Sequence, residues 1–223
     1  DDLARLDRER TVMLAGVSHD VRTPLAKLRL ALDISEPRLE PELFEQMGRY
    51  VDDIDALLDQ FLAFARIGSD EQIAATDVPA MINSLVDTYR RAGQPIATTA
   101  PERLIAQLRP MAFRRLLVNL LDNAMKYALP DSEINVSASN AEKDSRRGVA
   151  VSVHNLPGPA GWPDPKRLFS RYYRAPGAHR HTGTGLGLYL AARLTRQLGG
   201  ELEYTPDTSH VVFKLWLPAE ASL

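Results

Sequence analysis

The sequence predicts an α+β protein in two parts, a helical hairpin followed by a unit of long helices and short strands. In the first part apolar residues recur at helical spacing, whereas helix and strand patterns alternate beyond residue 77. The stretch Gly68-Ser69-Asp70-Glu71 separates the two patterns. We therefore expect the hairpin over residues 1–69, a linker over 70–76 and the second unit over 77–223.

The hairpin begins with a helix from about Asp2 to Ile34, in which Pro24 predicts a bend. One apolar stripe follows this helix through Leu14, Val17, Val21, Leu25, Leu28 and Leu32. Glu36 to Pro41 is typical of a turn, and a second helix follows from Glu42 to about Ile67. Its heptad seam consists of Leu43, Met47, Tyr50, Ile54, Leu57, Phe61 and Phe64. A hairpin alone cannot bury both seams, so we expect two copies to form a dimeric four-helix bundle.

The second unit is predicted to be an α+β sandwich. Its first helix runs from Val78 to Ala92, with Asp77 as the cap and Pro79 in the first turn. Two further helices are expected at Pro110 to Ala128 and Leu186 to Leu198, the latter ended by Gly199-Gly200. The predicted strands are Ile96–Thr99, Leu104–Leu108, Ile134–Ser139, Val149–His154, Glu201–Tyr204 and Val211–Leu217.

Composition excludes several function classes. The formal charge is only −2, from 27 Lys+Arg and 29 Asp+Glu, so no overall field favours nucleic acid. The sequence has no cysteine, which excludes disulfides and thiolate metal sites. No apolar run approaches the roughly 18 residues of a membrane span, and no signal peptide is visible. The chain begins in a charged helical pattern, as though it were cut from something longer.

His19 stands apart from the apolar stripe of the first helix. It lies two residues from both Val17 and Val21, so it projects about 200° away from the stripe and into solvent. Neutral imidazole is a competent nucleophile, and the neighbouring Asp20 can orient the ring and accept its proton. For this histidine taken alone, the alternative is an exposed residue with no role.

A second polar constellation lies on the predicted helix from Pro110 to Ala128. Asn119, Asn123 and Lys126 fall at i, i+4 and i+7, so two amides and an ammonium share one face. Amide oxygens suit a hard cation such as Mg²⁺, and an ammonium suits phosphate. Taken alone, the same pattern also fits a polar surface stripe.

A glycine-rich turn from Gly183 to Leu188 leads into the last helix. Glycines let backbone N–H groups approach phosphate oxygens, and a helix N-terminus adds a favourable dipole, although glycine equally serves tight turns. The preceding segment supports an anion site, since residues 166–187 contain no acidic residue. Five cations lie in it: Lys166, Arg167, Arg171, Arg174 and Arg180.

Together these motifs resemble the sensor histidine kinases of bacterial two-component systems, along nearly the whole chain. His19 and its flanks are similar to the H box, and Asn119 to Tyr127 to the N box. Leu168 to Arg174 resembles the F box, and Gly183 to Leu188 the second glycine box. The stretch from Met13 to Leu25 is most similar to the EnvZ osmosensor branch.

The resemblance implies a fold and a reaction. The fold is a dimeric four-helix bundle followed by an α/β-sandwich ATP-binding domain of the histidine kinase, gyrase and Hsp90 type. His19 would attack the γ-phosphate of ATP, and the phosphoryl group would pass to an aspartate on a response regulator receiver domain, of the OmpR-like kind. Thr23 would hold a water for dephosphorylating that regulator. The parent protein would be a bacterial inner-membrane sensor, a homodimer with this part in the cytoplasm.

The resemblance also assigns roles to residues of the second unit. Asn123 binds Mg²⁺, Asn119 and Lys126 lie close to the phosphates, and Tyr127 lies near the nucleotide. The segment Ala175 to Thr182 forms a mobile lid over ATP. The remaining nucleotide-binding positions are Asn155, Arg174, Gly183, Thr184, Gly185, Leu186 and Gly187.

The first glycine box departs from the family pattern, which normally reads Asp-x-Gly-x-Gly after a strand. Here the segment from Asn155 to Pro159 reads Asn-Leu-Pro-Gly-Pro. The Asn155 amide oxygen can accept the adenine amino group, but without charge assistance. Pro157 and Pro159 each lack a backbone donor and restrict the turn. We expect weakened, reshaped or absent ATP binding relative to a typical member.

Three functions stay open on the sequence. The first is an ATP-dependent kinase that also dephosphorylates its regulator. The second is a phosphatase-biased or non-catalytic relative whose nucleotide pocket has decayed. The third is another ATPase of the same superfamily, such as the gyrase or chaperone type, but those proteins lack an H box on a dimerising hairpin.

Overall fold

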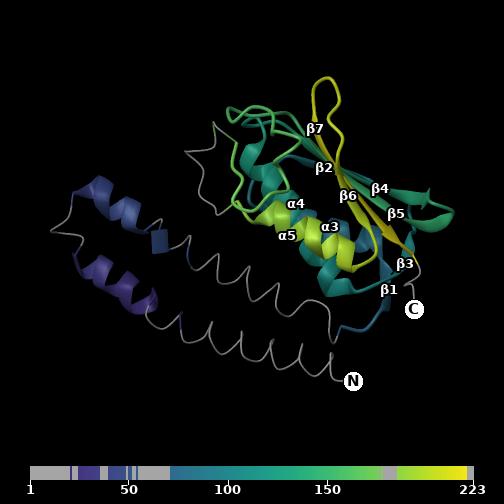
Figure 1. The fold of residues 1–223 in the computed structure, drawn as a ribbon, viewed down its shortest axis with the longest axis horizontal. Helices are drawn as coiled ribbons and strands as arrows, with labels where there is room; N and C mark the ends of the chain where they lie inside the picture. The colour runs from purple at the N-terminus through teal and green to yellow at the C-terminus, as the bar shows by residue number, and fades with distance from the viewer. Residues whose placement is uncertain are drawn as a thin grey trace. The chain divides into compact units, whose positions relative to one another are not determined.

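The computed structural model describes residues 21, 25–35, 40–48, 50–51, 54, 71–175, 177 and 185–219 (Figure 1). The chain divides into two compact units, one comprising residues 1–70 and 182–186 and the other residues 71–181 and 187–223. Within the described ranges, no helix combines the length and apolar character needed to span a membrane.

The described part of the hairpin is helical over residues 25–35 and 41–48, so Pro41 begins the second helix instead of ending the predicted turn. Proline is favoured in a first turn because the N–H there has no helical partner. Leu32 and Val51 are buried, with 5% and 4% exposed. A larger set of apolar side chains is exposed within one chain, namely Leu28, Leu30, Ile34, Leu43, Tyr50 and Ile54. A second copy is one way to cover such a surface.

The second unit contains a five-stranded sheet in the order β2-β4-β5-β7-β6. Only the β2–β4 pair is parallel. The strands are β2 Ile96–Thr99, β4 Ile134–Lys143, β5 Arg146–Asn155, β6 Glu201–Tyr204 and β7 Val211–Pro218. A separate two-stranded sheet pairs β1, Ala74–Asp77, with β3, Ile105–Leu108.

Three helices pack against one face of the large sheet (Figure 1). They are α3 Val78–Arg91, α4 Pro110–Tyr127 and α5 Gly187–Gln197. The core lies between the two layers, because alternate residues of β5 and one stripe of α4 are fully buried. These side chains include Phe113, Leu116, Leu117, Leu120 and Leu121 of α4 and Val149, Val151 and Val153 of β5. This is the predicted α+β sandwich.

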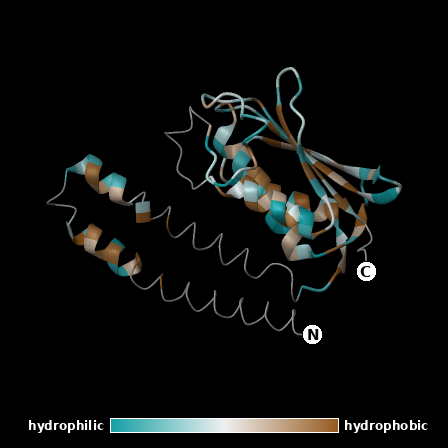
Figure 2. Ribbon diagram, in the orientation of Figure 1, coloured by the Kyte–Doolittle hydropathy of each residue, from teal (hydrophilic) through white to brown (hydrophobic). Residues whose placement is uncertain are grey.

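Strand β1 corrects the predicted linker, since residues 74–76 lie in a sheet. Its sequence, Ala-Ala-Thr-Asp, has one buried residue, so no alternating apolar pattern marks it. Strands β4 and β5 also extend beyond their predicted ends, as far as the pair Lys143 and Arg146. The turn end of this hairpin is hydrophilic (Figure 2), so backbone pairing and not burial continues the strands.

The helix ends explain where α3 and α5 begin and stop. Asp77 caps α3 by accepting from the Ala80 N–H at 3.1 Å, as the sequence predicts. Gly199 follows α5 with φ 73°, and the Gly200 N–H donates to the Thr195 carbonyl at 2.9 Å. This is a Schellman ending, which requires a residue that tolerates positive φ.

The N-terminus of α4 is capped from a distance. Its own N-cap residue, Arg109, makes no side-chain capping bond. Instead the Glu71 carboxylate accepts from the Met111 N–H and, at 3.0 Å, from the Ala112 N–H. A carboxylate at this end is also favoured by the helix dipole. Glu71 therefore links the segment before β1 to the first turn of α4 by hydrogen bonds.

Candidate functional site

Five of the residues assigned from the sequence lie outside the described residues, so their placement stays a prediction. They are His19, Asp20, Thr23, Gly183 and Thr184. Arg180 and most of the predicted lid, residues 176 and 178–182, also lie outside the described residues. The other candidates are described, and most of them lie in the second unit. Of the glycine turn, Gly185 has φ 71°, Leu186 follows it, and Gly187 begins α5.

The N-box residues Asn119, Asn123, Lys126 and Tyr127 all lie on the C-terminal half of α4. They are partly exposed, whereas Leu120, Leu121 and Ala124 between them are buried. The polar face predicted from the i, i+4, i+7 spacing is therefore present at the margin of the core.

The start of α5 lies against Asn119. The amide nitrogen of Asn119 donates to the Arg115 carbonyl at 3.1 Å, which fixes the orientation of the side chain. A Cβ atom added to Gly187 would lie 3.5 Å from the Asn119 Oδ1. The structure thus brings the N box and the last glycine of the glycine turn together.

The F box is anchored on the sheet and ends near Tyr127. Leu168 is 2% exposed, and the Phe169 ring packs edge-on against Phe213 with centroids 6.4 Å apart. Burial raises the pKa of Tyr127, while the nearby positive charge of Arg174 opposes that rise. Arg174 therefore lies close enough to Tyr127 for its charge to act on that hydroxyl.

Asn155 ends β5 and is 1% exposed. Its amide nitrogen donates to the Leu156 carbonyl at 3.0 Å, but its Oδ1 is buried without a hydrogen-bond partner. Strand alternation places this side chain on the same face as Val151 and Val153, toward the helices. A buried acceptor without a donor is costly. Its chemistry fits a ligand N–H, and the exocyclic amine of adenine supplies one.

The proline-containing segment after Asn155 pairs with the end of α4. Leu129 N–H donates to the Leu156 carbonyl at 3.0 Å, and Gly158 N–H donates to the Tyr127 carbonyl at 2.9 Å. Pro157 lies between these bonds, bridged to Ala128, so its missing N–H removes no bond from this pairing. A Cβ at Gly158 would lie 2.4 Å from the Ala128 carbonyl oxygen, so only glycine fits there.

The sequence alone did not reveal a contact that ties the F box to α5. The Arg171 guanidinium lies 5.0 Å from the centroid of the Tyr189 ring, and Arg193 donates to the Tyr189 hydroxyl at 3.3 Å. Hydrogen bonds from Arg193 and Arg171 lower the pKa of Tyr189. The i, i+4 spacing of Tyr189 and Arg193 was the available signal.

A second unexpected contact joins α3 to the N box. The Tyr89 hydroxyl donates to Asp122 at 2.7 Å, next to Asn123. Among the residues that the structure describes, no group of three or more His, Asp or Glu could hold a metal ion.

Two family models match the chain. The "Histidine kinase-, DNA gyrase B-, and HSP90-like ATPase" model matches residues 109–221, which is about half of the chain. The match lies mainly in the second unit, which is called the ATPase unit below. The "His Kinase A (phospho-acceptor) domain" model matches residues 9–70 and so contains His19. The order of the two models is the order predicted from the motifs.

Similar proteins include the swarming motility regulation sensor protein RssA of Serratia marcescens, 31% identical over 97% of this chain and 49% of that protein. The sensor histidine kinase GtrS of Pseudomonas aeruginosa is 29% identical over 89% of this chain and 40% of its own length. The chain thus spans at most about half of these relatives. The EnvZ-like branch stays a prediction.

Among solved structures, full-length ShkA in complex with AMPPNP has a TM-score of 0.66 at 24% identity, over 94% of this chain and 46% of that one. The Acinetobacter baumannii histidine kinase AdeS has a TM-score of 0.63 at 17% identity, over 91% of this chain and 98% of that one. These likenesses show the fold. With the two family models in their predicted order, the chain belongs to the two-component sensor histidine kinases.

Proposed function

We propose that this chain is the catalytic core of a sensor kinase that phosphorylates His19 from ATP and passes the phosphoryl group to a response regulator. The main support is the order of the two family models on one chain. The phospho-acceptor model, which spans His19, comes first and the ATPase model follows. Superfamily ATPases of the gyrase and chaperone type lack such a hairpin, so they are the weaker candidates.

The transfer needs a nucleophile, a proton acceptor and a leaving group. An imidazole nitrogen of His19 forms a bond to the γ-phosphorus, while the bond from that phosphorus to the bridging oxygen of ADP breaks. Asp20 accepts the imidazole proton. The phosphoryl group then moves to an aspartate oxygen of the receiver domain, and His19 is restored. We propose an OmpR-like receiver as this partner.

The ATPase unit supplies the nucleotide contacts in this proposal. Asn155 accepts from the adenine amine through the Oδ1 that lacks a partner. Lys126 and Arg174 offer positive charge to the phosphates, and Asn119 lies beside Gly187 at the start of α5. A bound Mg²⁺ would neutralise phosphate charge, with Asn123 as a candidate ligand. The remaining proposed contacts come from Tyr127, Gly183, Thr184, Gly185 and Leu186.

Three further parts of the proposal concern the whole protein. Thr23 holds a water that hydrolyses the aspartyl phosphate of the regulator, which makes the protein a phosphatase as well. The chain acts as a homodimer and is the cytoplasmic portion of a bacterial inner-membrane sensor. The helical hairpin ends at about residue 69, and the ATPase unit starts at residue 71 in place of residue 77.

The second candidate is a relative with weakened ATP binding that acts mainly as a phosphatase. It is favoured by the amide at position 155, which accepts hydrogen bonds less strongly than a carboxylate. Two observations weigh against complete loss of binding. Asn155 keeps a buried acceptor without a partner, and Pro157 removes no bond from the pairing with α4.

Incubation with γ-labelled ATP and Mg²⁺ separates the two candidates. The kinase predicts acid-labile label on the parent chain, none on His19→Ala, and parent-like label on His210→Ala, whose ring contacts Asp207 in its own turn. No label on the parent, together with no heat of ATP binding, would favour the second candidate.

The phosphatase step is tested with a phosphorylated receiver domain. Thr23→Ala should release phosphate from it more slowly than the parent does, and equal rates contradict the step.

A further inference from the structure

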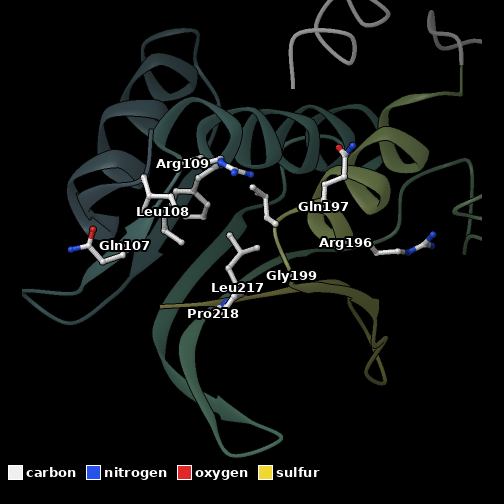
Figure 3. Close-up of a pocket in the computed structure, with 11 residues that line it drawn as sticks. Gln107, Leu108, Arg109, Arg196, Gln197, Gly199, Leu217 and Pro218 are labelled. Carbon is white, nitrogen blue, oxygen red and sulfur yellow. The ribbon is translucent and has the colours of Figure 1, made fainter. Parts of the chain in front are cut away.

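A cavity of about 240 Å³ lies at the end of the ATPase unit where α4 begins and α5 ends (Figure 3). Its walls come from Ile73 before β1, from the end of β3, from the start of α4, from the last turn of α5 and from the end of β7. Asn123 to Tyr127 lie at the other end of α4, roughly 25 Å away along the helix. The cavity is therefore separate from the nucleotide site.

Arg109 is the charged group directed into this cavity. Figure 3 shows its guanidinium pointing across the pocket, whereas the side chains of Arg196 and Gln107 point away from it. The Arg109 Nε is buried and makes no hydrogen bond, although the residue as a whole is partly exposed. Within the described part of the chain, no carboxylate forms an ion pair with Arg109, and no acidic residue lines the cavity.

This arrangement is unfavourable unless an acceptor is supplied. Burying a guanidinium N–H without a partner costs the hydration that it loses. The position is also unusual for arginine, because it is the N-cap of α4, which Glu71 caps in its place. The side chain thus serves neither the helix end nor an internal ion pair.

The other walls set the remaining chemistry of a ligand. About half of the wall is apolar, and this part is formed by Ile73, Leu108, Phe113, Leu198, Leu217 and Pro218. Typical ligand pockets measure roughly 300–1,000 Å³, so this cavity suits a compact molecule. A single anionic group would meet Arg109, and an apolar body would fill the space beside it.

We propose that this cavity binds a small organic monoanion, a carboxylate on a compact apolar body, which Arg109 recognises by a charge-assisted hydrogen bond. The site adds a small-molecule input to the ATPase unit that is independent of nucleotide. Because it uses neither His19 nor the N box, its test does not depend on kinase activity.

The test uses 2-naphthoate as the probe and 2-naphthamide as its neutral match, titrated into the full chain with methyl-labelled isoleucine and leucine. We expect saturable shifts in the methyl signals of Ile73, Leu108, Leu198 and Leu217 with 2-naphthoate. The amide should bind at least about tenfold more weakly, because it cannot form the charge-assisted bond. Arg109→Gln should remove this preference, and Arg103→Gln, an exposed arginine, should keep it.

Arg109→Gln breaks no side-chain bond, so it should fold, and its melting temperature checks this directly. Leu198→Phe provides a second variant that fills part of the cavity and leaves Arg109 in place, and it should weaken 2-naphthoate binding. The proposal is overturned if no saturable shifts occur up to roughly 10 mM probe, because the Kd would then be weaker than millimolar. Equal binding of the acid and the amide, or parent-like binding by Leu198→Phe, overturns it as well.

Discussion

Asn155 destabilises the folded state without nucleotide and offers an acceptor to a bound ligand. Its Oδ1 is buried without a partner, and its amide nitrogen donates to the Leu156 carbonyl. That carbonyl also accepts from the Leu129 N–H, so it would stay satisfied without the amide. The side chain can therefore be replaced by an apolar one of similar size without creating a new unpaired group.

We expect Asn155→Leu to stabilise the nucleotide-free ATPase unit by about 1–3 kcal/mol, the typical cost of one buried unsatisfied polar group. The same variant should bind ATP about tenfold more weakly, since it loses the acceptor for the adenine amine. Urea unfolding and titration calorimetry measure the two effects. Asn140→Leu, at an exposed position of β4, is the control and should change neither. A variant that is more stable but binds ATP like the parent would contradict the role of Asn155.

Single residues also show how far the sequence could be used. Asp77 and Gly199 were predictable as helix ends because capping depends on local order along the chain. Glu71 was not predictable as a cap, because it reaches α4 from about 40 residues away. The missing partner of Asn155 likewise depends on packing that brings β5 and the helices together. Motifs predicted the candidate site residues, whereas the partners of those residues depend on tertiary structure.

Helix α4 depends on Glu71, which supplies the cap that Arg109 does not. Loss of a side-chain cap typically costs about 0.5–2 kcal/mol. We expect Glu71→Ala to lower the free energy of unfolding of the ATPase unit by about 1 kcal/mol, or the melting temperature by about 2–4 °C. Tryptophan fluorescence measures this selectively, because both tryptophans, Trp162 and Trp216, lie in this unit.

Two controls make the Glu71 result specific. Glu102→Ala removes an exposed acid from a loop and should leave the unfolding midpoint unchanged. Glu71→Gln keeps an acceptor oxygen but loses the charge that the helix N-terminus favours, so it should fall between Glu71→Ala and the parent. Equal midpoints for Glu71→Ala and the parent would show that the capping bonds contribute nothing.

The contact between α3 and α4 makes the free energy of unfolding depend on pH in the alkaline range. Burial raises the pKa of Tyr89 above its ordinary value of 10.0, and the hydrogen bond to Asp122 adds to the rise. The folded state thus keeps a proton that the unfolded state loses, so the contribution of Tyr89 is complete below pH 10 and declines as pH rises above it. We expect Tyr89→Phe to be less stable than the parent at pH about 8.

Urea unfolding measured across pH tests the direction of this change in stability. Between pH about 9 and about 11 the parent should lose more stability than Tyr89→Phe, so the two curves converge. Tyr89→Phe should still lose some stability as pH rises, because burial also raises the pKa of Tyr127 and Tyr204. Tyr172→Phe, which removes a hydroxyl from a side chain that is 68% exposed, should follow the parent curve. Parallel curves for Tyr89→Phe and the parent would contradict the assignment.

The strands show why elements were easier to predict than their limits. Strands β5 and β7 carry dense apolar patterns and were expected close to where they occur. Strand β1 was missed, because its stability comes from pairing with β3, about 30 residues away in the chain. The turn end of β4 and β5 was missed for a related reason, since its polar residues pair through the backbone. Patterns of burial reveal the core and leave the edges of a sheet unmarked.

In the whole molecule, the ATPase unit buries its own core, but the described hairpin residues leave large apolar side chains exposed. Leu28 belongs to the apolar stripe of the first helix and is 50% exposed, whereas Leu30 is 60% exposed and lies off the stripe. A second copy that packs along the stripe would bury Leu28 and leave Leu30 in solvent. The two leucines, two positions apart, therefore form a matched pair.

We expect Leu28→Glu to convert the dimer into a monomer, because a carboxylate in a packed bundle interface would be buried without a partner. Leu30→Glu should stay dimeric, since it places the same charge on the opposite side of the helix. Sedimentation velocity on the two variants and the parent measures the change, and tryptophan fluorescence checks that the ATPase unit is folded in each. If Leu30→Glu dissociates and Leu28→Glu does not, the stripe is not the dimer interface and the two copies must pair through another surface.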